Sequence, residues 1–196
     1  MAEWEQAWIA LGSNLGDRAG ALMTAREALD AHSETRVRAA SGLWETEPVG
    51  PPGQGPYLNA VVAVETRLDA RTLLKFLLSL ERDAGRDRDD QAERWGPREL
   101  DLDLLLFGAA CIREVGLEVP HPRMHARRFV LAPLCEIAAD QLHPRLGRSM
   151  GSLLDECSCD PQQVWPWREA GPWHFQAPCG AGAASGSSEA NSLSSN

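Results

Sequence analysis

The stretch RWGPRELDLDLLLFG, from Arg94 to Gly108, combines the pattern of a buried strand with two acidic residues. Its leucines first alternate with the acids and then run on without interruption, which is typical of a strand that enters a hydrophobic core. Side chains two residues apart on a strand share a face and are separated by roughly 6.5 to 7 Å along the chain. Asp101 and Asp103 are therefore expected to project together.

Two carboxylates on one face need positive charge nearby. At this spacing bare carboxylates repel each other by about 2 to 3 kcal/mol at an effective dielectric constant near 20. One interpretation is that the acids only solvate the start of the strand, or pair with arginines. The other is that they bind a hard divalent cation such as Mg²⁺, which prefers oxygen ligands. The same face is expected to continue into the core with Leu105 and Phe107, which favours the second interpretation.

Arginines precede the acidic pair, at positions 86, 88, 94 and 98. Guanidinium groups bind phosphate oxygens in a bidentate manner, and all of the 19 basic residues except Lys75 are arginine. Acids for a metal and arginines for phosphate are the components of a phosphoryl or nucleotidyl transferase. The sequence contains neither a P-loop motif nor the protein-kinase motifs, so the nucleotide would have to be bound in another way.

Outward from this stretch, strand-like and helix-like patterns alternate. The expected elements are strands at 7–12, 36–46 (with Val37, Ala39, Ser41 and Leu43 on one face), 57–66 and 100–107, and helices at 16–31 and 71–85, the second capped by Asp69. The order βαββαβ predicts a ferredoxin-like α+β sandwich with an antiparallel sheet. Further helices are expected at 127–139, with Pro133 inside or near the first turns, and at 149–157.

Composition predicts a cytoplasmic protein with one folded domain at 1–160. The 196 residues include five scattered cysteines, which suggest neither a disulfide framework nor a zinc site. No apolar run approaches the roughly 20 residues that span a membrane, and the first residues lack a basic leader. Residues 161–196 are expected to be a C-terminal extension, low in complexity and disordered from about 178, although its aromatic residues could pack on the domain. The net charge of −9 argues against a nucleic-acid partner.

The motif from Arg94 to Arg98, followed by Leu100-Asp101-Leu102-Asp103-Leu104-Leu105, resembles the signature of the 6-hydroxymethyl-7,8-dihydropterin pyrophosphokinase family of folate biosynthesis. Other matching motifs are IALGSNL at 9–15, ETEPVG at 45–50, YLNA at 57–60 and VPH at 119–121, with Arg127 and Phe129. The resemblance runs from about residue 7 to about residue 157, and it implies the same ferredoxin-like fold that the patterns predict.

The resemblance also implies an activity. Members transfer the pyrophosphoryl group of ATP to the hydroxymethyl oxygen of 6-hydroxymethyl-7,8-dihydropterin and release AMP. Carried over to this sequence, Asp101 and Asp103 would bind two Mg²⁺ ions, with ATP as co-substrate, and Arg86, Arg88 and Arg98 would be catalytic. ATP and the dihydropterin would be the partners of a monomer, with no membrane partner.

Two sets of binding residues follow from the resemblance. The pterin ring would lie between Tyr57 and Phe129, with Asn59 on its polar edge, the backbone near Thr46 and Val49 beside it, and Trp95 closing over it. The nucleotide-binding set would comprise Glu81, Arg88, Arg98, Leu104, His121 and Arg127.

Two alternative functions remain open. A palm-type nucleotidyl transferase also places paired metal-binding acids on a ferredoxin-like sheet, but it releases pyrophosphate instead of AMP. A non-catalytic small-molecule-binding module on the same fold would not require an arginine-rich segment beside two acids. An RNA-recognition module would need exposed aromatic residues and a basic face, which the composition does not supply.

Overall fold

A curved antiparallel sheet is the centre of the protein, which is described by a computed structural model covering residues 3–47, 54–85, 98–157, 163–167 and 173. The strands are β1 (Glu5–Ser13), β2 (Thr35–Ala40), β3 (Trp44–Thr46), β4 (Tyr57–Thr66), β5 (Asp101–Phe107), β6 (Ile112–Glu114), β7 (Leu117–Val119) and β8 (Val164–Pro166). The helices are α1 (Arg18–Ala31), α2 (Ala70–Asp83), the 3₁₀ turn η1 (Met124–Ala126), α3 (Arg128–Ala138) and α4 (Met150–Glu156).

The strand order confirms the ferredoxin-like prediction. The main sheet runs β5-β1-β4-β3-β8, and β2 also pairs with β4. β3 pairs with residues 57–59 of β4, whereas β2 pairs with residues 62–66, so these two short strands occupy successive lengths of one edge. All of these pairings are antiparallel.

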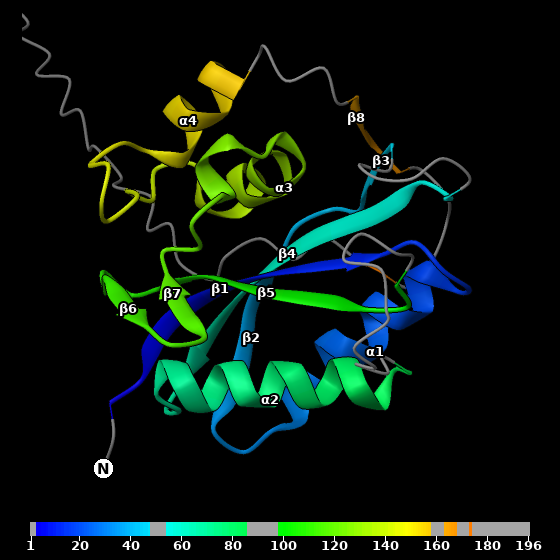
Figure 1. Ribbon diagram of the computed structural model, residues 1–196, viewed down its shortest axis with the longest axis horizontal. Helices are drawn as coiled ribbons and strands as arrows, with labels where there is room; N and C mark the ends of the chain where they lie inside the picture. Colours follow the sequence, from blue (N-terminus) through cyan, green and yellow to red (C-terminus); the bar gives the residue numbers. More distant parts are fainter. Residues whose placement is uncertain (1–2, 48–53, 86–97, 158–162, 168–172, 174–196) are drawn as a thin grey trace, which may run out of the picture.

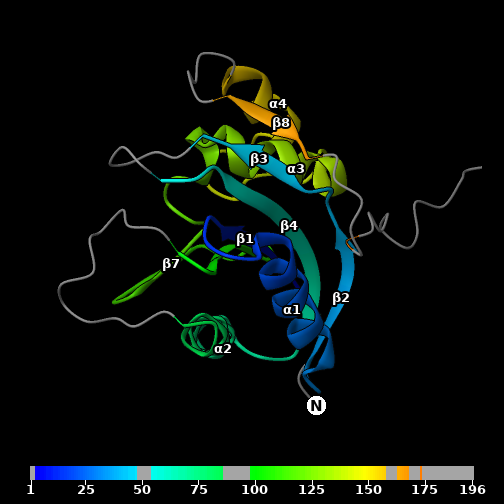
Figure 2. The ribbon, with the colours of Figure 1, turned by 90° about the vertical axis from the view of Figure 1, so that its right-hand side faces the viewer.

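Helices cover both faces of the sheet, which gives three layers (Figure 1). α1 and α2 cover one face, and α3 and α4 lie on the other, as the rotated view shows (Figure 2). The two hydrophobic clusters follow these layers. Leu22 of α1 and Leu77 of α2 belong to the cluster with Ile9 and Leu102, while Leu131 of α3 belongs to the opposite cluster.

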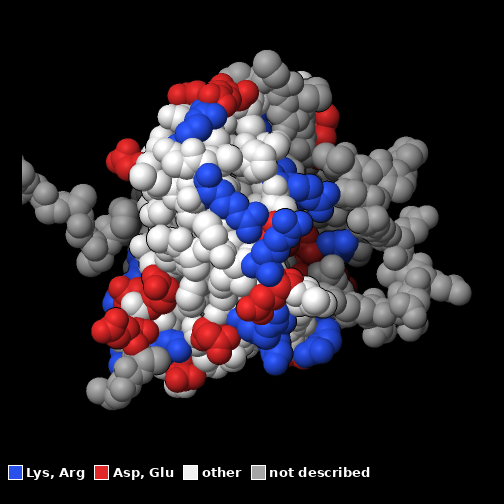
Figure 3. All heavy atoms as spheres, turned by 60° about the vertical axis from the view of Figure 1, so that its left-hand side comes forward, with Lys and Arg blue, Asp and Glu red and all other residues white. Residues whose placement is uncertain are grey.

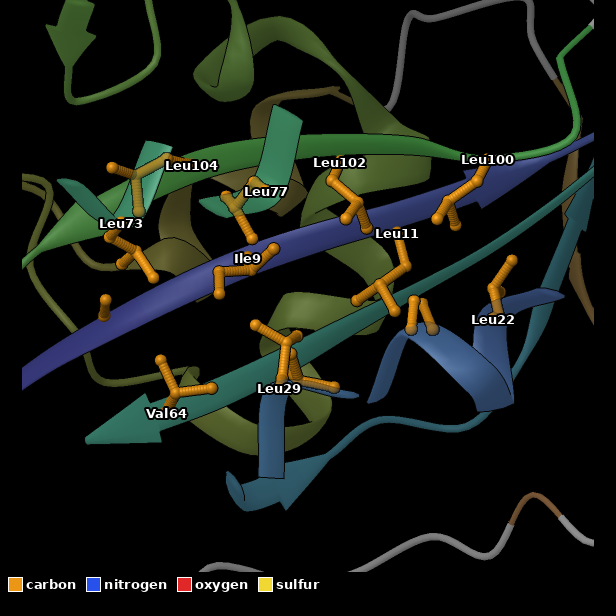
Figure 4. Packing of buried hydrophobic residues seen from close by; sticks show 14 of the residues in the cluster. Ile9, Leu11, Leu22, Leu29, Val64, Leu73, Leu77, Leu100, Leu102 and Leu104 are labelled. Carbon is orange, nitrogen blue, oxygen red and sulfur yellow. The ribbon is translucent and has the colours of Figure 1, made fainter. Parts of the chain in front are cut away.

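Figure 4 shows the larger cluster, in which leucines of β5 point toward the helices α1 and α2. Leu100, directly before β5, and Leu102 and Leu104 within it are 3%, 3% and 4% exposed, so alternate residues of this segment form core. Asp101 and Asp103 occupy the positions between them and must face the α3 side. The alternation therefore explains how one strand carries both core leucines and a pair of acids.

A β-bulge changes the face of the last β5 residues. Ile9 pairs with Leu104 but Trp8 pairs with Leu106, so Leu105 is the extra residue. Leu105 packs in the cluster on the α3 side, as expected. Phe107 packs against the α1 and α2 cluster instead, so the expectation that it shares the face of the aspartates is wrong.

The helices begin where side chains can cap them. Asp17, Asp69 and Ser149 each accept a hydrogen bond from the backbone N–H three residues later, at the start of α1, α2 and α4 respectively. α2 confirms the predicted helix after Asp69, and Gly85 follows it with a φ of 98°, a conformation that favours glycine. α3 contains Pro133 within its span, as predicted.

Other expectations need correction. The predicted strand 36–46 is divided into β2 and β3, and a register shift between Val37 and Ala39 places those residues in opposite clusters. The hairpin β6–β7 and the strand β8 were not expected. β8 belongs to the predicted C-terminal extension, yet it pairs with β3. The domain boundary at 160 stays a prediction, and residues from 178 onward lie outside the described part.

Within the described residues, no helix is long and apolar enough to cross a lipid bilayer.

Candidate active site

A row of four paired residues crosses the sheet on the α3 side. Asp101 of β5 pairs with Gly12 of β1, Gly12 pairs with Asn59 of β4, and Asn59 pairs with Trp44 of β3. Cross-strand partners point to the same face, so the Asp101 carboxylate and the Asn59 amide lie on one surface. They are separated only by a glycine.

Gly12 has no side chain to fill the space between Asp101 and Asn59. A Cβ atom added to Gly12 would lie 3.6 Å from the Asn59 Oδ1 atom and 4.0 Å from the Asp101 Cβ atom. Any larger side chain at this position would fill the space between the acid and the amide. The glycine therefore leaves room for a ligand that contacts both.

Asp103 lies in the next row on this face, where it pairs with Ala10. Its Oδ2 atom is 3.8 Å from His121 Nε2 and 3.8 Å from Arg127 Nη1. The backbone N–H of His121 donates to the Leu105 carbonyl at 2.9 Å, so the segment after β7 is attached to β5 at its bulge. Both distances are too long for hydrogen bonds, and the Asp103 side chain is 38% exposed.

Asp101 has a closer cationic neighbour. Arg98 Nη1 donates to Asp101 Oδ1 at 2.6 Å. The Arg98 backbone is in turn held by Asn14: its N–H donates to Asn14 Oδ1 at 2.6 Å, and the Asn14 N–H donates to the Arg98 carbonyl at 3.0 Å. Arg98 is therefore fixed beside the acidic pair by the end of β1.

The charges around these residues shift their pKa values. Burial lowers the pKa of His121, and the Asp103 carboxylate opposes that shift. Burial also lowers the pKa of the Arg127 guanidinium, and the neighbouring Arg123 adds to this effect. Arg123 likewise lowers the pKa of His121, so a third basic group lies near the two that face Asp103.

Tyr57 connects the acidic end of the site with the Asn59 end. Burial raises the pKa of its phenol, while the charge of Arg98 lowers and that of Asp101 raises it. Tyr57 lies two residues before Asn59 and therefore on the same face of β4. Asn59 Nδ2 donates to Thr46 Oγ1 at 3.0 Å and to the Trp44 carbonyl at 3.4 Å.

The Asn59 amide is oriented by these two bonds. Because its nitrogen is used, its oxygen points elsewhere, and none of the described residues donates to that oxygen. Phe129 stands at the start of α3 on the same side of the sheet, with its ring 5.4 Å from the Arg127 guanidinium carbon. An amide and two aromatic rings therefore lie on the side where the acids emerge.

The structure brings together a subset of the predicted residues. Arg98 contacts Asp101, and His121 and Arg127 lie near Asp103. Tyr57, Asn59, Thr46 and Phe129 lie on the same side of the sheet. Val49, Arg86, Arg88 and Trp95 lie outside the described residues.

Glu81 and Leu104 are not part of this surface. The Leu104 side chain is 4% exposed in the α1 and α2 cluster, because alternation along β5 turns it away from the aspartates. Glu81 is buried on α2, on the same far side, and its Oε1 atom accepts a hydrogen bond from the Leu102 N–H at 2.8 Å. Their side chains therefore do not face the other predicted nucleotide-binding residues.

Sequence reasoning did not assign roles to Gly12, Asn14 or Arg123. Gly12 and Asn14 belong to the quoted IALGSNL motif, and a glycine and an asparagine at the expected end of a strand were the available signal. Asn14 is buried in the structure. Arg123 belongs to a basic cluster in HPRMHARR, directly after the cis Val119–Pro120 bond.

The donor set fits Mg²⁺ only if a substrate supplies further ligands. Among the described residues there is no group of three or more His, Cys, Asp or Glu side chains that could hold a metal. Two carboxylates on one face suit Mg²⁺, which is commonly bound by one or two carboxylates together with water and phosphate oxygens. Figure 3 shows one face of the molecule, on which basic and acidic side chains lie close together.

Comparisons with known proteins show which family the chain resembles. A model of the 7,8-dihydro-6-hydroxymethylpterin-pyrophosphokinase (HPPK) family matches residues 8–139. The 2-amino-4-hydroxy-6-hydroxymethyldihydropteridine pyrophosphokinase of Pseudomonas aeruginosa is 42% identical over 153 residues, which cover 78% of this chain and 92% of the relative. The enzyme of the same name from Bacillus subtilis is 47% identical over 131 residues, 67% of this chain and 77% of the relative.

Solved structures show the same fold. A crystal structure of HPPK-DHPS in complex with substrates matches 79% of this chain with a TM-score of 0.63 and 13% identity, and this chain spans 43% of its length. Wild-type HPPK-DHPS of Plasmodium falciparum matches 79% with a TM-score of 0.61 and 14% identity, and this chain spans 45% of its length. From the family match and the two bacterial relatives, the chain belongs to the 7,8-dihydro-6-hydroxymethylpterin-pyrophosphokinase family of enzymes.

Proposed function

We propose that this protein transfers the pyrophosphoryl group of ATP to 6-hydroxymethyl-7,8-dihydropterin, with release of AMP. The observation that carries the proposal is the row Asp101–Gly12–Asn59, in which a carboxylate that could hold the metal and phosphate lies on the same surface as an amide that could bind the pterin. Family membership supplies the two substrates.

The acidic and basic residues form the ATP end of the proposed site. Asp101 and Asp103 would hold Mg²⁺, which when bound neutralises phosphate charge and orients the triphosphate. Arg98 and Arg127 flank the acids, and their guanidinium groups can bind the phosphate oxygens that the acids would repel. His121 stands beside Asp103 and can donate a hydrogen bond to a phosphate oxygen when it is protonated.

The dihydropterin end depends on shape and hydrogen bonding. Asn59 has an oriented amide, and its oxygen can accept a hydrogen bond from a ring N–H of the pterin. Tyr57 and Phe129 supply the aromatic faces for stacking. With the acceptor held beside the phosphates, catalysis consists mainly of positioning the hydroxymethyl oxygen in line with the β-phosphorus.

Product analysis tests the proposal. Purified protein is incubated with ATP, Mg²⁺ and 6-hydroxymethyl-7,8-dihydropterin, and nucleotides are separated by ion-exchange chromatography. AMP should form in equal amounts with the pterin diphosphate, and omission of the pterin or addition of EDTA should stop both. If the complete mixture yields no AMP, the proposed reaction is wrong.

The same chromatogram separates the two alternatives. A palm-type nucleotidyl transferase would release pyrophosphate and attach the AMP moiety to its acceptor. A binding module would leave ATP intact while still binding the pterin. Neither alternative is favoured by a described residue over the proposed reaction.

A further inference from the structure

Strand β8 covers the edge of the sheet nearest to the pterin-binding residues. Without it, β3 would be the outer strand beside β4. Val164 pairs with Thr46, and Trp165 pairs with Glu45, while the Trp167 N–H donates to the Leu43 carbonyl at 2.8 Å. This strand lies beyond residues 8–139, which the family model matches. Figure 2 shows it alongside β3.

A side-chain network attaches β8 to two other elements. Trp165 Nε1 donates to Glu45 Oε2 at 3.2 Å, and Arg18 Nη1 donates to Glu45 Oε1 at 2.8 Å. The same Arg18 nitrogen donates to the Pro56 carbonyl at 2.7 Å, directly before Tyr57. Trp165 is therefore connected through one carboxylate to the start of α1 and to the start of β4.

A second tryptophan fixes the other end of the same segment. Trp173 Nε1 donates to the Ser41 carbonyl at 2.7 Å, and the Arg26 guanidinium carbon lies 5.3 Å from its ring centroid. Ser41 also accepts a hydrogen bond from the Val61 N–H through its Oγ atom at 2.9 Å. The chain between β2 and β3 is thus held to β4 on one side and to Trp173 on the other.

The pterin-binding residues lie on the opposite face of β3 from this network. Glu45 points toward α1, whereas Trp44 and Thr46 are its neighbours and point toward α3. Thr46 Oγ1 is the acceptor that orients the Asn59 amide. Movement of β3 would change that acceptor position, although no atom of β8 needs to contact the substrate.

We propose that β8 and Trp173 form a positioning element for the dihydropterin end of the site, with Trp165 as its main positioning residue. Trp165 acts through Glu45 and β3 on Thr46, and Thr46 acts on Asn59. The identity of the substrate in this inference rests on the proposed function. The effect of β8 on the orientation of the Asn59 amide does not depend on that substrate. It gives a role to a segment outside the matched family region.

The test replaces one hydrogen bond in the full-length chain. Trp165→Phe keeps an aromatic ring but removes the indole N–H that donates a hydrogen bond to Glu45. Trp4→Phe is the matched control, because Trp4 lies between Arg36 and Arg67, and the adjacent Glu5 pairs with Thr66 at the other end of the sheet. Steady-state kinetics with each substrate is measured for both variants and for the wild type, with thermal unfolding as a check of folding.

Trp165→Phe should raise the KM for the dihydropterin about fivefold, equivalent to about 1 kcal/mol. Its kcat and its KM for ATP should stay within about twofold of the wild type, the range expected for a change that leaves phosphate binding intact. Trp4→Phe should change none of them. A general loosening of the fold would alter both KM values together, and that result would overturn the proposal.

Exchange of the Asn59 side-chain amide protons, followed by NMR, separates this inference from the proposed function. The exchange should be faster in Trp165→Phe than in the wild type and unchanged in Trp4→Phe. Unchanged exchange in Trp165→Phe would overturn the positioning role even if the enzyme makes AMP. A wild type that makes no AMP would reject the proposed reaction, and faster exchange would then still support positioning of Asn59.

Discussion

Asp103 and Asp101 stand two residues apart but have different environments. Asp101 is bound by Arg98 at 2.6 Å, whereas Asp103 lies 3.8 Å from the His121 ring and 3.8 Å from the Arg127 guanidinium group. Asp103 is also the more exposed side chain, at 38% against 29%. Under the proposed function, Asp103 would therefore depend more than Asp101 on the Mg²⁺ ion that accompanies the triphosphate of ATP.

Asp103→Asn should lower kcat by at least about 100-fold, the usual effect of removing one group that stabilises transition-state charge. The dissociation constant of the dihydropterin should be unchanged, because Asn59 and Tyr57 are left intact. Kinetics and isothermal titration measure the two quantities. Asp140→Asn is a suitable control, since Asp140 is exposed after the last turn of α3. Equal activity of Asp103→Asn and the wild type would contradict the proposed role.

His121 predicts a pH dependence of stability. Burial lowers its pKa in the folded state from the usual 6.5, so below about pH 6.5 the unfolded state binds more protons. The free energy of unfolding contributed by this residue is present above pH 6.5 and is lost as the pH falls toward the folded pKa.

Denaturant unfolding at pH 7.5 and 5.5 measures this effect. The wild type should lose stability between the two values, and His121→Gln should lose less. His143, whose pKa is also lowered by burial, should account for part of the remaining loss. A His121→Gln variant with the same or a larger loss than the wild type would show that His121 is not responsible.

At the scale of elements, α2 supports the strand that carries the acidic pair. Glu81 accepts a hydrogen bond from the N–H of Leu102, the residue between the two aspartates. Glu81→Ala should lower the free energy of unfolding by about 1 to 3 kcal/mol, because it removes the acceptor of a buried N–H. Glu81→Gln keeps an acceptor and should lose less. Equal losses in the two variants, measured by urea unfolding, would contradict this role of the bond.

The start of α2 permits a second test at this scale. Asp69 accepts a hydrogen bond from the Thr72 N–H at 2.8 Å. Asp69→Ala should lower the free energy of unfolding by about 1 kcal/mol, the usual effect of losing an N-cap. Glu27→Gln changes an exposed residue of α1 and should alter stability by less than about 0.5 kcal/mol. A loss no greater than that of the control would show that this cap does not stabilise α2.

Elements with local signals were predicted from the sequence, and those set by pairing were not. The apolar stripe after Asp69 and the β-branched run of β4 specify a helix and a strand by themselves. The bulge at Leu105 depends on the register between β5 and β1, which no local pattern contains. β8 has only three residues and includes a proline, so it lacks the alternating pattern from which a strand can be predicted. Its pairing with β3 was therefore not predictable.

The site was predictable to the same extent. Asp101, Asp103 and Arg98 are close in sequence, and strand geometry alone places the two acids on one face. Their approach to His121 and Arg127 depends on the bond between His121 and the β5 bulge. The inward direction of the Leu104 side chain follows from alternation along β5, while a nucleotide-binding role for this residue stays a prediction.

At the scale of the whole molecule, the apolar layer under α3 and α4 ends where the candidate site begins. Trp8 and Leu106 pair within that apolar cluster, while Gly12 and Asp101 pair at the other end of the same two strands. The same sheet face is therefore core at one end and carries the candidate site at the other. The acids gain a rigid support without being enclosed.

Under the proposed function, the acids and the Asn59 amide on this surface together support transfer of an intact pyrophosphoryl group. The most direct measurement is a single turnover with ATP labelled at both the β- and γ-phosphorus atoms, with excess enzyme and dihydropterin. Both labels should appear together in the pterin product and the AMP should carry none, while Asp103→Asn should transfer neither label in the same time. A product that contains only the γ label, or labelled pyrophosphate released into solution, would contradict the account.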